Sequence, residues 1–106
     1  MRGGAGLDLH NLVKWYIGIY MKPKEIVEVE RVQTGVRMEK RLLKVLKALA
    51  ELKDLTLGDL LEGIVLHAFE GKAPFSQQTL KEIEQIRGIY GLTLRAVDSH
   101  KLKERR

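Results

Sequence analysis

The chain has 106 residues, of which 44% are hydrophobic and 31% are charged, so it fits one core with arms and excludes two independent domains. The net charge of +5 and the pI near 9.6 favour a polyanionic partner, although fourteen interspersed acidic residues keep that signal moderate. The absence of cysteine excludes disulfides, thiolate zinc sites and cysteine nucleophiles, and it is consistent with a cytoplasmic location.

Residues 1–30 are predicted to form an N-terminal arm. The apolar run from residue 12 to residue 21 has about half of the ~20 residues that a membrane-spanning helix needs, and it contains Lys14. A signal peptide is not expected, because Asp8 precedes the run and no small-residue cleavage site follows it. The run suits an amphipathic helix that begins at Asp8, or a strand. We expect the arm to pack on the core or on a partner subunit and not on a membrane, and Met21 is an alternative natural start of the protein.

Residues 31–38, RVQTGVRM, have the period-two pattern of a half-buried β-strand. One side of the extended backbone would carry Val32, Thr34, Val36 and Met38, and the other side Arg31, Gln33, Gly35 and Arg37. The chain that follows is mostly helical in its pattern, so it offers no second strand. An unpaired strand leaves its backbone N–H and C=O groups without partners, and the pattern therefore predicts that a second chain pairs with this one.

Two amphipathic helices are predicted next. In residues 39–54 leucines and a valine recur every three or four residues, and basic residues occupy the opposite side. The second helix should run from about Leu57 to Glu70, with Thr56 as its N-cap and Gly71 as its C′ residue. Apolar residues cover well over half of its circumference, which predicts burial on more than one side.

The strand and the two helices comprise only about 40 residues, a size at which a core usually needs metal, disulfides or oligomerisation. Since the chain has no cysteine and few metal ligands, a second copy of the chain is the expected source of the missing packing. The two copies of residues 31–38 would pair as an antiparallel ribbon. The predicted dimer core consists of Val32, Thr34, Val36, Leu61, Ile64 and Val65.

Residues 31–71 resemble the ribbon-helix-helix DNA-binding proteins, a family that includes bacterial repressors and many antitoxins. The resemblance rests on a short strand, a helix with spaced leucines, a tight turn and a capped second helix, which are here GVRMEKRLL, LAELKD and LTLGDLL. It implies a mainly α fold, in which an obligate homodimer has one intermolecular antiparallel β-ribbon, an N-terminal arm and additional C-terminal helices. Two positions depart from the family, because Asp54 stands where a turn glycine is common and Gly35 stands at a base-reading position. Asp adopts the left-handed conformation better than most residues, so the first departure is compatible with the fold.

The resemblance also implies double-stranded DNA as the partner and a role as a transcriptional regulator, such as a repressor. The ribbon would enter the major groove with Gln33, Gly35 and Arg37 facing the bases, where Arg can bind guanine and Gln can bind adenine. The phosphate contacts would be Arg31, Thr56, Leu57 and Gly58, the last three of them at the start of the second helix. The competing interpretation is that the polar side of the ribbon is only its solvated side.

Residues 72–106 are predicted to be a helical extension with a basic tail. Ser76 is a suitable N-cap and Gly91 a suitable end for a third helix, whose apolar stripe is expected to dock on Leu66. A short helix capped by Thr93 should follow. The tail carries Lys101, Lys103, Arg105 and Arg106, and it is expected to fray.

We expect no catalytic group, no cofactor and no metal site in this chain. His67 and Glu70 have a helical metal-ligand spacing but lack further ligands, and Ser76, Ser99 and His100 form no triad-like context. The protein is therefore not expected to be an enzyme. The alternative to DNA binding is an antitoxin-like protein-interaction module, in which residues 72–106 bind another protein and the dimer is the platform.

Overall fold

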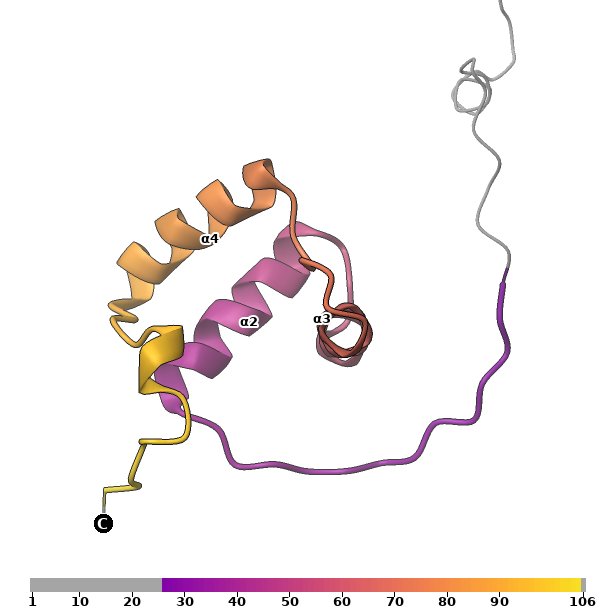
Figure 1. Cartoon of the computed structure of the whole chain (residues 1–106), viewed down its shortest axis with the longest axis horizontal. Helices are drawn as coiled ribbons and strands as arrows, with labels where there is room; N and C mark the ends of the chain where they lie inside the picture. The colour runs from indigo at the N-terminus through magenta and orange to yellow at the C-terminus, as the bar shows by residue number, and fades with distance from the viewer. Residues whose placement is uncertain (1–25, 106) are drawn as a thin grey trace, which may run out of the picture. The chain divides into compact units, whose positions relative to one another are not determined.

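The computed structural model describes residues 26–105 of the chain. Its helices are α2 (Lys40–Leu52), α3 (Leu57–Phe69) and α4 (Gln77–Tyr90), followed by the 3-10 helix η1 (Ala96–Asp98) (Figure 1). This order confirms that the described chain is mainly α. The chain divides into two units between Thr34 and Gly35, and these helices all belong to the second unit. Most of the predicted N-terminal arm, residues 1–25, lies outside the described residues.

The strand predicted for residues 31–38 is wrong. Residues 26–39 have no regular secondary structure, and the described part of the chain contains no strand. Val32 and Val36, expected on the buried side, are 80% and 74% exposed. An alternating sequence determines which side chains share one side of an extended backbone, but a strand also needs a hydrogen-bonded neighbour, and residues 26–105 supply none. The structure therefore contradicts the intermolecular β-ribbon, and with it the ribbon-helix-helix architecture.

Helix α2 lies within the predicted range of residues 39–54, but it starts one residue later and ends two residues earlier. The Glu39 carboxylate accepts a hydrogen bond from the Leu42 N–H at 2.8 Å, which caps the helix and lowers the pKa of Glu39. At the other end Asp54 takes a left-handed conformation with φ 58°, and the Leu55 N–H donates to the Ala50 carbonyl at 2.9 Å. Asp54 thus occupies a position in which glycine is usual, as the sequence indicates.

Helices α3 and α4 are bounded by the predicted residues. The hydroxyls of Thr56 and Ser76 each accept a hydrogen bond from the backbone N–H three residues later, at 3.0 Å and 3.1 Å. After each helix a glycine takes a left-handed conformation, with φ 69° at Gly71 and φ 66° at Gly91. A side chain would be strained at such φ values, so these two positions favour glycine.

The short helix expected to begin at Thr93 is wrong in position and in type. The chain instead forms η1, and the Arg95 N–H just before it donates to the Asp98 carboxylate at 2.8 Å. This hydrogen bond closes the first turn, so the helical segment starts at Ala96 and lasts three residues.

A small core lies between α2 and the two helices that flank it. Helix α4 lies alongside α2, and α3 crosses it (Figure 1). The buried hydrophobic residues are Val45, Leu49, Ala50, Leu60 and Leu92. Phe75, Ile83 and Ile86 pack against this cluster from the region of α4.

The predicted docking of α4 on Leu66 is also wrong, because Leu66 is 63% exposed and α4 packs on α2 instead. The physical reason is that the apolar surface of α2 is more extensive than the apolar surface around Leu66. Around Leu49 and Ala50, α2 offers a continuous apolar surface, whereas Leu66 has two acidic neighbours, Glu62 on α3 and Glu70 at its C-terminal end.

Candidate nucleic-acid interface

The three predicted base-contacting residues are exposed, but they do not lie in one structural unit. Gln33 belongs to the first unit, and Gly35 and Arg37 belong to the second. A Cβ placed on Gly35 would meet no atom within 4 Å, so nothing in the described chain requires a glycine there. These residues lie in a segment without regular secondary structure, so they do not form one side of a sheet.

Arg37 has a partner that the sequence did not predict. Its Nε donates to Glu104 Oε1 at 3.2 Å, and a terminal guanidinium nitrogen donates to Glu104 Oε2. Both side chains are exposed. The two residues are 67 positions apart, and no local pattern in the sequence links them. The tail that was expected to fray is therefore in contact with the residue assigned to base readout.

The predicted phosphate site at the start of α3 is partly occupied by the chain's own groups. The Thr56 hydroxyl accepts the Asp59 N–H, and the Asp59 side chain lies in the first turn. The N–H groups of Leu57 and Gly58 have no carbonyl four residues earlier within the helix, and they remain the donors of this site. Leu57 is half-buried and Gly58 exposed. Arg31, the fourth predicted phosphate contact, belongs to the first unit.

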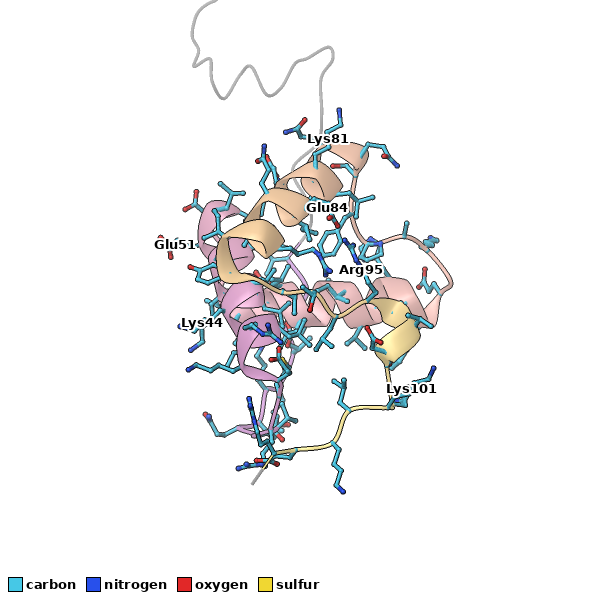
Figure 2. All side chains as sticks on the ribbon, turned by 90° about the vertical axis from the view of Figure 1, so that its left-hand side faces the viewer. Lys44, Glu51, Lys81, Glu84, Arg95 and Lys101 are labelled. Atoms are coloured by element: carbon cyan, nitrogen blue, oxygen red, sulfur yellow. The ribbon has the colours of Figure 1, made fainter. Side chains whose placement is uncertain are left out.

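The outer side of α2 is basic. Lys40, Lys44 and Lys47 are exposed there, and none of them makes an ion pair with another described residue. Lys44 lies over the ring of Tyr90, with its Nζ 6.0 Å from the ring centroid. Figure 2 shows Lys44 and Glu51 on the same side of the helix. Three lysines on one side of a rigid helix create a positive surface that suits a polyanion.

The outer side of α3 is apolar, and most of it is uncovered. Leu60 is the buried residue of this helix, while Leu61 and Ile64 are half-buried and Val65 is exposed. Phe69 is 81% exposed. Leu61, Val65 and Phe69 recur at four-residue intervals and so share one face, whereas Ile64 packs against the core. The predicted dimer-core residues of this helix are Leu61, Ile64 and Val65, but Val32, Thr34 and Val36, the rest of that set, are exposed in the irregular segment.

Polar contacts fix the C-terminal part of the chain to the helices. Figure 2 shows Arg95 close to Glu84, and the Arg95 guanidinium donates to that carboxylate at 2.9 Å. This contact lowers the pKa of Glu84. The Arg87 guanidinium donates to the Leu94 carbonyl at 2.8 Å. The segment after α4 is thereby held against its own helix.

On α2 two basic residues bind the neighbouring helix α4. Lys53 pairs with Glu82 at 2.9 Å and lowers its pKa. Arg41 donates to the carbonyl of Gly91 at 2.9 Å, at the C-terminal end of α4, where the helix dipole favours a positive charge. These two contacts hold the first half of α4 to Lys53, just after α2, and the C-terminal end of α4 to Arg41 in α2.

The described residues contain no group of three side chains that could hold a metal ion. His67 is hydrogen-bonded through Nδ1 to the Gly63 carbonyl at 2.7 Å within its own helix. Among residues 26–105 no helix is both long enough and apolar enough to cross a membrane. The absence of a catalytic group and of a cofactor stays a prediction from the sequence.

Comparison with known proteins gives no relative. No family model matches the chain, and no match was found among curated proteins or solved structures. The resemblance of residues 31–71 to ribbon-helix-helix proteins therefore rests on the sequence alone, and its ribbon is contradicted by the structure.

Proposed function

We propose that the chain is a DNA-binding protein that works as a homodimer and regulates transcription by occupying a site on DNA. The observation that carries the proposal is the separation of two surfaces on neighbouring helices. The outer side of α2 is lined by Lys40, Lys44 and Lys47, while the outer side of α3 is apolar around Val65 and Phe69. A polyanion matches the first surface, and a second copy of the chain matches the second.

The homodimer part of the proposal is supported by the size of the core. Five buried hydrophobic residues among residues 26–105 are few, and small domains with so little burial usually gain stability by association. Leu61, Val65 and Phe69 together form a face that a second copy could cover, beside Ile64, which is half-buried against the core. Burial of apolar surface contributes about 25 cal/mol per Å², so covering this face would add several kcal/mol.

The DNA part of the proposal is supported by charge and exposure. Gln33 and Arg37 are exposed in an irregular segment that leads into α2, and Lys40 and Lys47 lie exposed on the helix itself. An exposed segment with an amide and a guanidinium can reach phosphates or base edges as an arm, without forming a ribbon. The assignment of Gln33, Gly35 and Arg37 to bases, and of Arg31, Thr56, Leu57 and Gly58 to phosphates, stays a prediction.

The proposal is tested by selecting duplexes from a random library with the full chain at several salt concentrations, together with sedimentation equilibrium of the free protein. We expect a subset of sequences to be enriched, the logarithm of the affinity to fall linearly with the logarithm of the salt concentration, and a dimer at micromolar concentration. Binding without enrichment that vanishes at moderate salt would contradict specific recognition. A compact monomer that melts cooperatively would contradict the dimer.

A second candidate function is the binding of another protein by residues 72–106. It is favoured by apolar side chains that the C-terminal part leaves uncovered: Ile89 on α4 is 76% exposed and Val97 in η1 is 70% exposed. Deletion of residues 72–106 would not test it cleanly, because Leu92 belongs to the core. Ile89→Asp should abolish the binding of such a partner, whereas Gln77→Asp, an exposed position at the other end of the same helix, should retain it.

A further inference from the structure

The contact between Arg37 and Glu104 joins the C-terminal tail to the segment just before α2. It is a two-point contact, in which two guanidinium N–H groups bind the two oxygens of one carboxylate. The same fork of donors binds two oxygens of a phosphate group. Glu104 therefore presents to Arg37 the geometry that a phosphate would present.

The C-terminal tail begins after a buried residue and a short 3-10 helix. Leu92 is buried, and η1 follows it. His100 then takes a left-handed conformation with φ 67°, and the Lys101 N–H donates to the Asp98 carbonyl at 3.1 Å. After this turn, residues 101–105 have no regular secondary structure, and Glu104 within them contacts Arg37.

The charges around the contact favour an anion stronger than one carboxylate. Lys103 and Arg105 flank Glu104 in the tail, and Lys40 follows Arg37 by three residues at the start of α2. All of them are exposed. The basic groups of the tail and Lys40 thus lie on the two segments that the Arg37–Glu104 contact joins, and their combined potential attracts a phosphate more than a neutral base edge.

We propose that Arg37 and the C-terminal tail form a phosphate-binding site, in which Glu104 is an internal counter-ion that a phosphate of duplex DNA displaces. The inference rests on the proposed DNA-binding function and assigns Arg37 to a phosphate and not to a base. Displacement leaves Lys103 and Arg105 beside the DNA backbone. The tail is then part of the binding surface, and Glu104 lowers the affinity of the free protein for anions.

The test compares full-length wild type with Glu104→Gln and Glu70→Gln in binding to a 20-bp duplex at about 0.1 M salt. Glu70 is a matched control, because it is an exposed carboxylate that also pairs with a basic residue, Lys72, at 3.1 Å. Glu104→Gln should bind about three- to tenfold more tightly than wild type, and Glu70→Gln should stay within about twofold. The double variant Lys103→Ala/Arg105→Ala should bind more weakly to all sequences alike, with a salt slope smaller by about 2.

A second readout follows the Arg37 Nε–H resonance by NMR while sodium tripolyphosphate is added. The resonance should shift in wild type, and it should shift at a lower tripolyphosphate concentration in Glu104→Gln. If wild type binds no duplex but this shift occurs, the phosphate site is supported while the proposed DNA function fails. If the duplex binds but Glu104→Gln behaves like Glu70→Gln, the tail site is overturned while DNA binding stands. Unchanged melting curves would confirm that these exposed substitutions leave the fold intact.

Discussion

The two helices that flank α2 differ in how well their outward side chains are packed and paired within the chain. Helix α4 is joined to α2 by packing of Ile83 and Ile86 and by contacts such as the 2.9 Å ion pair of Lys53 with Glu82. Helix α3 buries Leu60 and leaves Phe69 in solvent. Helix α4 is therefore held on α2 within one chain, although Ile89 stays exposed, whereas the outer side of α3 is an exposed apolar surface that another chain could cover.

This difference separates the part of the molecule that stabilises one chain from the part where we propose that a second copy associates. Substitutions on the α2–α4 side should change the free energy of unfolding of one chain. Substitutions on the outer side of α3 should change the dissociation constant of the dimer and leave the folded chain largely intact.

The largest effect is expected at Leu49, which is 2% exposed at the centre of the core. Leu49→Ala should lower the free energy of unfolding by about 2–5 kcal/mol, because it leaves a cavity where α2 meets its neighbours. Urea denaturation measures the change. Leu66→Ala is the control, and it should cost no more than about 0.5 kcal/mol in the monomer. Equal losses for the two variants would show that the outer side of α3 belongs to the core of the single chain.

The next effect concerns association. Phe69→Asp places a charge in the exposed apolar face of α3, and it should raise the dissociation constant of the proposed dimer at least tenfold while the helical circular dichroism is retained. Sedimentation equilibrium measures the dissociation constant. Lys72→Asp, an exposed position just beyond the helix, is the control and should leave the dimer intact. A Phe69→Asp protein with unchanged association would remove α3 from the interface.

The ends of the helices could be predicted from the sequence because their signals are local. Thr56, Ser76 and Gly91 act on backbone groups within a few residues, and the structure places each where the sequence indicates. The strand at residues 31–38 could not be judged in this way, because alternation says nothing about a hydrogen-bonded neighbour. The Arg37–Glu104 contact was not predictable either, since it depends on the course of the chain after α4. At the candidate interface, the sequence predicts that Arg37 is exposed, but it does not predict that Glu104 is its partner.

A smaller effect on the free energy of unfolding is expected in the turn between α2 and α3, where Asp54 has φ 58°. Asp54→Gly should raise the free energy of unfolding by about 0.5–1 kcal/mol, because glycine adopts this conformation without a steric penalty. Asp54→Val should lower it, since a β-branched residue is strained there. Thermal melting of the three proteins measures the order. If Asp54→Gly were the least stable of the three, a side-chain role of Asp54 would outweigh the backbone term.

The smallest expected effect is a pH dependence of the free energy of unfolding, which arises from the ion pairs of α4. A hydrogen bond from Lys53 lowers the pKa of Glu82, and one from Arg95 lowers the pKa of Glu84, both from an ordinary value of 4.5. The unfolded chain therefore binds protons more readily than the folded chain, and the stability from these contacts is present above the unfolded pKa and lost as the pH falls through the folded pKa.

The free energy of unfolding should accordingly fall as the pH is lowered from about 5 to about 3, and urea denaturation at a series of pH values measures the slope. The double variant Glu82→Gln/Glu84→Gln should have a smaller slope in this range. It should not be flat, because the Leu42 N–H also lowers the pKa of Glu39 at the start of α2. The Arg95–Glu84 contact is exposed and the Lys53–Glu82 contact is partly exposed, so both are screened by salt and the effect should shrink at high ionic strength. If the double variant kept the full slope of wild type, the polar contacts of α4 would be incidental, and the α4 side would rest on its apolar packing alone.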